Sequence, residues 1–302
     1  IVGKRFVITD EKKMTPYTEG WRLGGGPAAA IVRPATLLQM WKVLKRCVEA
    51  DFAIIVQASN TGLTGGSTPN GRDYDRPVVI INTLRIDDIH LLDDSKQFIA
   101  FAGATLFRLE EILHDRGREP HSVLGSSCIG ASIVGGVCNN SGGALLQRGP
   151  AYTELALYAQ INSEGALELI NDLEVELGDS PEEMLQTLQN KQYSRNHIRA
   201  TNKLASDRTY QNTVRDVEAS TPSRFNHDST RLHGASGCAG KIAVFAVRVD
   251  SYELPAKKQV FYIGVHDTHL LETMRREILR NFNHLPVSGE YIHRRVYDVT
   301  KK

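Results

Sequence analysis

Two long glycine-rich windows without a charged residue constrain this chain more than any other feature of its 302 residues. They span residues 52–71 and 122–147 and hold ten of the 25 glycines. With 24% of all residues charged, about 11 charges are expected in the two windows, and none is present. Surface loops normally carry charge, so we expect both windows to be buried against a bound group.

The first window reads as a strand that opens into a glycine loop. The apolar run 52–56 is followed by residues 57–67, in which glycine recurs among small polar residues. Glycine has no Cβ to keep a ligand off the backbone, and side chains such as Ser59, Asn60, Thr61 and Ser67 add donors. The loop is therefore expected to hold phosphate oxygens.

The second window has the same character between residues 125 and 143. Residues 131–137 are predicted to form a short helix whose N-terminus, near Gly130, adds free N–H groups. Because neither window contains Lys or Arg, backbone dipoles must hold the anion. The pair predicts a large cofactor with an anionic part. The alternative, tight turns packed inside a sheet, explains one such loop more readily than two.

Composition narrows the class of protein. Hydrophobic residues make up 41% of the chain and the net charge is +1, which is typical of a soluble globular protein, and the length suggests about two domains. No basic excess or aromatic and basic stripe indicates a nucleic-acid partner. No apolar run approaches the ~20 residues of a membrane-spanning helix.

The cysteines and the N-terminus carry two further expectations. Four cysteines without a C-x-x-C pair favour a reducing compartment and argue against a thiolate metal site. The N-terminus lacks an initiator Met and a signal-peptide pattern, so we expect the chain to start inside a longer protein.

The chain order predicts a βαβ unit that delivers the first glycine loop at the carboxyl end of a strand, where α/β sheets bind ligands. Its parts are a strand at 28–32, a helix at 36–50 capped by Thr36, and a strand at 52–57. Residues 1–27 are expected to be loop, and 171–232 a surface insertion with one helix at 181–189. Further strands are expected at 78–81, 89–92, 98–102, 155–161, 166–170, 241–249 and 261–265, and helices at 106–116 and 270–282.

Three other motifs lack the sequence context that a binding site of their kind requires. The G-x-G-x-x-A of residues 24–29 follows no buried strand, and Pro27 removes a donor. The run 234–241 resembles a phosphate-binding loop, but its glycine spacing is short and Ile242 replaces the required Ser or Thr. The pairs His266/His269 and Glu290/His293 are better explained as solvated surface than as metal ligands, so no metal is expected.

Residues 57–71, 118–130 and 137–143 resemble the respiratory, quinone-dependent D-lactate dehydrogenases, which are FAD enzymes of the vanillyl-alcohol-oxidase type. The resemblance continues through 148–154, 236–241 and 260–264, so it covers nearly the whole chain and is weakest near 190–212.

This resemblance implies an α+β fold: a two-subdomain FAD-binding domain over residues 1–260, and the beginning of a truncated substrate or cap domain at 261–302. It implies FAD contacts at Ala58, Ser59, Asn60, Thr61, Gly62, Gly66, Ser67, Gly125, Ser132, Gly142 and Val244.

It also implies oxidation of D-lactate to pyruvate with electrons passed to quinone, by a peripheral protein on the cytoplasmic side of the bacterial inner membrane. No residue of this chain is expected to be the catalytic base, which the resemblance places beyond Lys302. An FAD oxidase of another 2-hydroxy acid and a non-catalytic nucleotide-binding module remain the alternatives. The exact hydroxy acid, the electron acceptor and the oligomeric state stay open.

Overall fold

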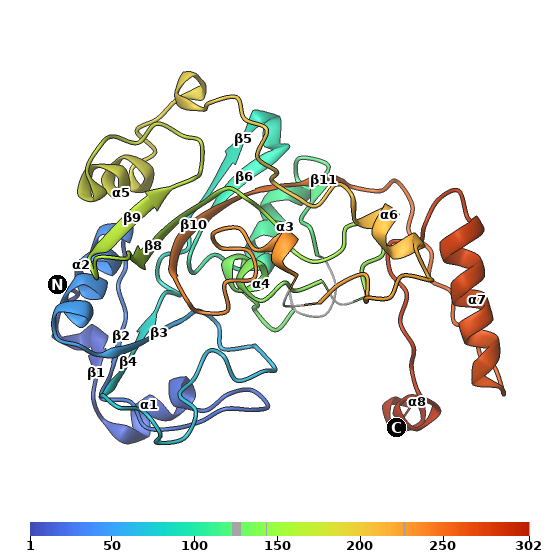
Figure 1. The fold of residues 1–302 in the computed structure, drawn as a ribbon, viewed down its shortest axis with the longest axis horizontal. Helices are drawn as coiled ribbons and strands as arrows, with labels where there is room; N and C mark the ends of the chain where they lie inside the picture. The colour runs from blue at the N-terminus through green and yellow to red at the C-terminus, as the bar shows by residue number, and fades with distance from the viewer. Residues whose placement is uncertain (123–127, 143, 226–227, 302) are drawn as a thin grey trace.

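The computed structural model describes residues 1–122, 128–142, 144–225 and 228–301, and it contains two main sheets with helices between and around them (Figure 1). The first sheet has the strand order β1-β2-β4-β3. Strands β2, β4 and β3 run parallel, and β1 is antiparallel to β2. The strands are β1 (Val7–Ile8), β2 (Ala30–Val32), β3 (Ala53–Gln57) and β4 (Val78–Asn82).

The predicted βαβ unit is confirmed. Helix α2 (Leu37–Glu49) connects β2 to β3 and begins at Thr36, whose hydroxyl accepts a hydrogen bond from the Gln39 N–H over 3.1 Å. Strand β4 pairs between β2 and β3. The loop that follows β3 therefore leaves the carboxyl edge of a parallel sheet, next to the end of β4.

The second sheet is antiparallel throughout, with the order β5-β6-β10-β8-β9. Helices α3 and α4 pack on one face of it, through an apolar cluster that includes Leu109, Val137 and Val247. The elements are β5 (Ile89–Leu92), β6 (Gln97–Phe101), α3 (Leu106–His114), α4 (Ile133–Cys138), β8 (Ala156–Ile161), β9 (Leu167–Asn171) and β10 (Ala243–Asp250). A two-stranded sheet pairs β7 (Arg118–Glu119) with β11 (Tyr252–Glu253).

Helix α2 joins the two main sheets into one core. Its buried face contacts Val79 and Ile81 of the first sheet and Phe101 and Phe245 of the second within a single cluster. The Trp41 and Phe245 rings lie 6.4 Å apart between centroids. The two subdomains thus share a hydrophobic layer, which fixes the two sheets relative to one another.

Residues 171–232 differ from the expected surface insertion. The predicted helix is present as α5 (Pro181–Gln189), but it packs on α2, and its Leu185 and Leu188 are fully buried. Leu173, Val175 and Leu177 enter the same core. The high charge of the segment hid these sparse apolar positions. Helix α6 (Tyr210–Arg215) follows in the same segment.

The N-terminal segment, expected to be loop, contains helix α1 (Glu11–Thr18) and β1. Asp10 caps α1 by accepting a hydrogen bond from the Lys13 N–H over 3.1 Å. The prediction was wrong because α1 is short, polar and contains Pro16. Its stability comes from tertiary packing, since Met14 is buried against Ile31 and Ile80 of the first sheet.

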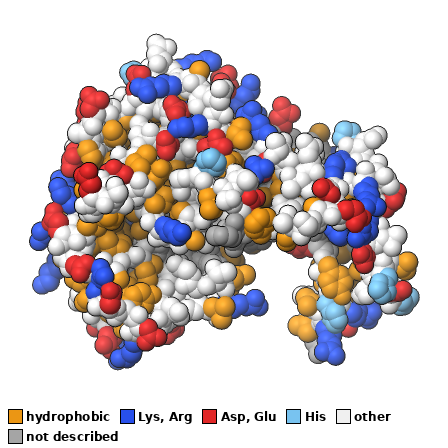
Figure 2. Space-filling model, in the orientation of Figure 1, with side chains coloured by type: hydrophobic (Ala, Val, Ile, Leu, Met, Phe, Trp, Pro, Cys, Tyr) orange, Lys and Arg blue, Asp and Glu red, His pale blue; other side chains and the backbone are white. Residues whose placement is uncertain are grey.

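The strand expected at 261–265 is also absent, and Phe261 and Tyr262 are 72% and 86% exposed. No strand in the described part of the chain pairs with this segment, so its apolar pattern has no sheet to join. Helices α7 (Thr268–Asn281) and α8 (Arg294–Thr300) extend away from the main body (Figure 1). On the side seen in Figure 2, this extension mixes basic, acidic and histidine side chains.

Candidate cofactor site

The first glycine loop is held in shape by its own polar side chains and by α1. Asn60, at φ 53°, donates to the Glu19 carbonyl over 2.7 Å and accepts from the Ser67 hydroxyl over 2.7 Å. The buried Gln57 amide donates to the carbonyls of Tyr17 and Ser67, each over 2.7 Å. Both ends of the loop are therefore tied together and to α1. The predicted roles of Asn60 and Ser67 must include this scaffolding.

The main chain of this loop is left free to bind. None of the N–H groups of residues 59–67 donates to an acceptor in the described part of the chain. The Ser59 Oγ is buried and has no hydrogen-bond partner among the described residues. Free N–H groups and an orphaned hydroxyl on one loop are what an anionic ligand requires.

The glycines of this loop divide into two kinds. Gly65 has φ +75°, and a Cβ there would lie 3.1 Å from the Leu23 carbonyl oxygen, so the fold itself requires glycine. Gly62 and Gly66 have no positive φ; a Cβ on Gly66 would meet nothing within 4 Å, and one on Gly62 would meet only the Ser67 Oγ, at 4.0 Å. The protein alone does not explain glycine at these two positions. A ligand lying against the backbone would.

The rejected Gly24–Gly26 run has a structural purpose instead. A Cβ on Gly24 would lie 2.9 Å from the Gly65 Cα, and one on Gly26 would lie 2.2 Å from the Gly71 carbonyl oxygen. The Gly71 N–H donates to the Gly25 carbonyl over 2.8 Å. This glycine run therefore packs backbone to backbone against the first glycine loop and supports it.

A cavity of about 430 Å³ opens beside the loop, between residues 15–21 and Ser59 and Asn60. Trp21 lies on its rim and is 65% exposed. The end of α1 and the residues that follow it are part of the candidate site that the sequence did not reveal, because a capped polar helix carries no cofactor motif. The one sequence signal for the start of α1 was Asp10, a strong N-cap residue three positions before Lys13.

The second glycine segment forms the start of α4, as predicted. Ser132 caps the helix by accepting from the Gly135 N–H over 3.1 Å. A Cβ on Gly142 would lie 2.6 Å from both the Gly149 carbonyl oxygen and the Pro150 Cα, so backbone packing alone accounts for that glycine. Gly125 lies outside the described residues.

Val244 is buried in the core between β10 and α4, in contact with the cluster that contains Val137 and Tyr158. The β10 register shifts between Val244 and Ala246. A cofactor contact at Val244 would therefore have to come from its main chain. The structure thus places Ala58, Ser59, Asn60, Thr61, Gly62, Gly66 and Ser67 on one loop of the first sheet, and Ser132, Gly142 and Val244 around α4 on the second.

The chain on either side of the second glycine segment is held by charged residues that were not predicted from the sequence. Arg148 is 10% exposed at its side chain; it pairs with Glu119 and donates to the Pro120 carbonyl over 2.9 Å. Lys258 also pairs with Glu119, over 2.8 Å. Burial opposes ionisation of Glu119, but the hydrogen bonds from Lys258 and Arg148 outweigh it and lower its pKa. His121, beside Arg148, has its pKa lowered to about 4, first by burial and then by that positive charge.

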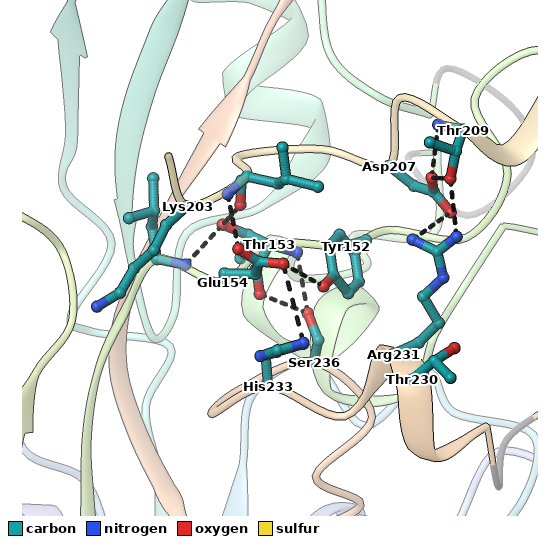
Figure 3. A network of polar contacts seen from close by, with 12 residues as sticks. Tyr152, Thr153, Glu154, Lys203, Asp207, Thr209, Thr230, Arg231, His233 and Ser236 are labelled. Atoms are coloured by element: carbon teal, nitrogen blue, oxygen red, sulfur yellow. Dashed lines mark hydrogen bonds and ion pairs between the residues drawn. The ribbon is translucent and has the colours of Figure 1, made fainter. Parts of the chain in front are cut away.

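A second polar network fixes the chain ahead of β10 (Figure 3). The Tyr152 hydroxyl donates to Glu154 over 2.8 Å, and Arg231 pairs with Asp207 over 3.3 Å. The Ser236 hydroxyl donates to the Thr153 carbonyl over 2.7 Å. The Ser236 contact joins residues 152–154 to the 230–236 segment, and Tyr152, Asp207 and Arg231 border a small cavity of about 150 Å³. The arrangement is a positioning network and contains no nucleophile paired with a base.

Sequence families match two parts of the chain. The FAD binding domain family matches residues 28–156, and the family described as D-lactate dehydrogenase, membrane binding, matches residues 260–302. The first match contains the glycine loop and α4. The division at 260/261 expected from the sequence remains a prediction.

Curated relatives resemble the chain over its full length. It is 56% identical over 302 residues to the quinone-dependent D-lactate dehydrogenase of Haemophilus influenzae and 53% identical to that of Escherichia coli. These alignments cover 100% of this chain but 54% and 53% of the relatives, so the chain spans about half of their length. The bovine mitochondrial D-2-hydroxyglutarate dehydrogenase is 31% identical over 145 residues, 47% of this chain and 25% of that protein.

Solved structures support the fold alone. An alkyldihydroxyacetonephosphate synthase matches 84% of this chain and 39% of its own, with a TM-score of 0.54 and 12% identity. A p-cresol methylhydroxylase matches 85% of this chain and 42% of its own, with a TM-score of 0.50 and 13% identity. The predicted α+β, two-subdomain FAD-binding fold of the vanillyl-alcohol-oxidase type is confirmed.

Proposed function

We propose that this chain belongs to the family of the quinone-dependent D-lactate dehydrogenases, to three of which it is 45–56% identical over its whole length, and that it serves FAD-dependent oxidation of D-lactate to pyruvate. The electrons then pass to a quinone. The observation that carries the proposal is the first glycine loop. Its free N–H groups, its orphaned Ser59 hydroxyl and its unexplained Gly62 and Gly66 fit a ligand that carries phosphate.

In this mechanism the chain's own residues bind and orient. Residues 59–67 hold the anionic part through main-chain N–H groups, and Asn60 and Ser67 keep the loop rigid. Such preorganised donors stabilise the bound group without reorganising. When bound, FAD would supply the acceptor for the two electrons of the alcohol. The ion pair between Glu119 and Arg148 ties β7 to the end of the second window.

The site residues are part of this proposal. Ala58, Ser59, Asn60, Thr61, Gly62, Gly66 and Ser67 form the phosphate cradle, and the α4 start with Ser132 lines the second side. Gly125, Gly142 and Val244 complete the set that the family resemblance implies. No residue of this chain is proposed as the base.

We also propose a peripheral location on the cytoplasmic face of the inner membrane. The match of residues 260–302 to a membrane-binding family supports membrane contact. Within the described residues, no helix has both the length and the apolar composition needed to cross a bilayer. A 2-hydroxy acid and a quinone are the proposed partners.

The test uses the full-length gene product with D-lactate and a soluble quinone analogue. We expect D-lactate to be oxidised and the quinone to be reduced in equal amounts, with L-lactate turned over far more slowly. Stoichiometric peroxide in place of quinone reduction would assign an oxidase instead. Bound FAD without oxidation of any 2-hydroxy acid would assign a non-catalytic binding module.

A further inference from the structure

Two cysteines that lie 100 positions apart in the sequence meet at the end of α4. Cys138 is the last residue of α4, and Cys238 lies in the turn that leads into β10. The two segments are joined on both sides of Cys238. The Gly237 N–H donates to the Val137 carbonyl and the Ala239 N–H donates to the Cys138 carbonyl, each over 3.2 Å.

The two cysteine side chains are close together, as their backbones are. The two thiols are close enough for each to shift the pKa of the other, and both border the apolar cluster that α4 shares with β10. Backbone hydrogen bonds from the residues on both sides of Cys238 to Val137 and Cys138 bring the two cysteine Cα atoms close together, and a disulfide spans Cα separations of about 4.4–6.8 Å. Neither thiol is in a disulfide in this structure.

The environment gives the two thiols different chemistry. The neighbouring Cys138 thiol lowers the pKa of Cys238 to about 7, and the backbone at Gly240 and Ile242 acts in the same direction against the effect of burial. The Cys238 thiol, together with burial, raises the pKa of Cys138 well above its ordinary value. Cys238 is thus the nucleophilic thiolate and Cys138 a retained thiol that can resolve an oxidised neighbour.

We propose that Cys138 and Cys238 form a redox-active dithiol that a hydroperoxide converts to an intramolecular disulfide joining α4 to the segment before β10. The Cys238 Sγ attacks the peroxide, the O–O bond breaks, and a sulfenic acid and an alkoxide or hydroxide form. The leaving oxygen takes up a proton. The Cys138 Sγ then attacks the Cys238 Sγ; the S–S bond forms, the S–O bond breaks, and water leaves with the Cys138 proton.

Two thiols lose two electrons in this sequence and the peroxide gains them, giving one disulfide, one water and one alcohol or second water. A thiol reductant reverses the reaction by thiol–disulfide exchange. The consequence is structural. α4 begins at Ser132 in the second glycine segment and ends at Cys138, so the disulfide restrains the helix that forms one side of the candidate cofactor site.

The experiment treats the purified, reduced chain with hydrogen peroxide and follows its intact mass and its peptides. We expect a loss of about 2 Da and one new cross-linked pair containing Cys138 and Cys238, both reversed by dithiothreitol. In Cys138→Ser, Cys238 should accumulate as a sulfenic acid that dimedone traps. In Cys238→Ser, peroxide consumption should fall at least about tenfold, since a thiol of ordinary pKa is a few per cent thiolate at neutral pH.

Cys128→Ser is the matched control, because Cys128 is exposed and lies outside the pair; it should form the Cys138–Cys238 link at the wild-type rate. The proposal is overturned if the reduced wild-type chain yields no Cys138–Cys238 peptide while other cysteines oxidise. It is equally overturned if Cys128 consumes peroxide as fast as Cys238. The peptide assignment is made on the wild-type chain, so it decides the matter even if a variant does not fold. It needs no bound FAD and no turnover, so it is independent of the proposed function.

Discussion

Adjacent glycines in the first loop provide the sharpest perturbation, because the structure assigns them opposite roles. Gly65 has φ +75°, and an added Cβ would lie 3.1 Å from the Leu23 carbonyl oxygen. An L-residue in the left-handed region costs about 1–2 kcal/mol. The close contact adds to that cost, so Gly65→Ala should lower the free energy of unfolding by about 2 kcal/mol.

Gly66→Ala should leave the fold intact. A Cβ there meets nothing within 4 Å, and its φ is not positive. Restricting the unfolded chain should even raise the free energy of unfolding, by about 0.4–1 kcal/mol. The same Cβ enters the space in which a ligand would approach the N–H groups. Loss of one hydrogen bond to a charged group costs about 1.5–3 kcal/mol, so the Kd for FAD should rise about tenfold to a hundredfold.

The assay pairs urea unfolding, followed by far-ultraviolet circular dichroism, with FAD titration followed by flavin fluorescence. The wild-type chain and both variants are measured together. The reasoning is refuted if Gly66→Ala binds FAD as tightly as the wild type. It is also refuted if the two substitutions destabilise the fold equally.

Three further results are expected. Trp41→Ala should lower the free energy of unfolding by about 3–5 kcal/mol and loosen both sheets together, since Trp41 packs in the layer that they share; loss of hydrogen-exchange protection in only one sheet would contradict this. Asn60→Ala removes the hydrogen bonds to Glu19 and Ser67, so the loop should become protease-sensitive and FAD binding should weaken while β3 stays protected from hydrogen exchange; unchanged proteolysis would count against the scaffold role. His121 has a pKa of about 4 in the folded protein against an ordinary 6.5. Its contribution to the free energy of unfolding is therefore complete above pH 6.5, and about 3 kcal/mol of it is lost as the pH falls towards 4. In His121→Asn the pH dependence of unfolding should be shallower over that window, and a pH dependence equal to that of the wild type would contradict the assignment.

Most of the fold was predictable wherever the apolar period was strong. The helix at 36–50 has a capping Thr36 and a wide apolar face, and it formed within one residue of both predicted ends. Segments 1–27 and 171–232 were misread because charged and polar residues surround the few positions, such as Met14 and Leu185, that reach the core. Burial of single side chains depends on tertiary contacts that no local pattern contains. The strand expected at 261–265 failed for the reverse reason: an apolar run without a partner strand stays exposed.

The candidate site was likewise predictable from the sequence only in part. Glycine content and the absence of charge located both segments, because those are properties of the sequence. Which glycines the fold itself requires was not visible, since the contacts of Gly24 with Gly65 and of Gly142 with Pro150 join segments that are distant in the chain. The scaffolding by α1 and the Arg148–Glu119 pair were hidden for the same reason.

The central claim is that the two glycine segments form an FAD cradle, and the visible absorption spectrum of the purified chain tests it most directly. The chain is purified, supplied with excess FAD, freed of unbound flavin, and measured before and after acid release, with circular dichroism to confirm that it is folded. The account predicts flavin absorption bands and about one releasable FAD per chain. A folded chain that retains no FAD would contradict it.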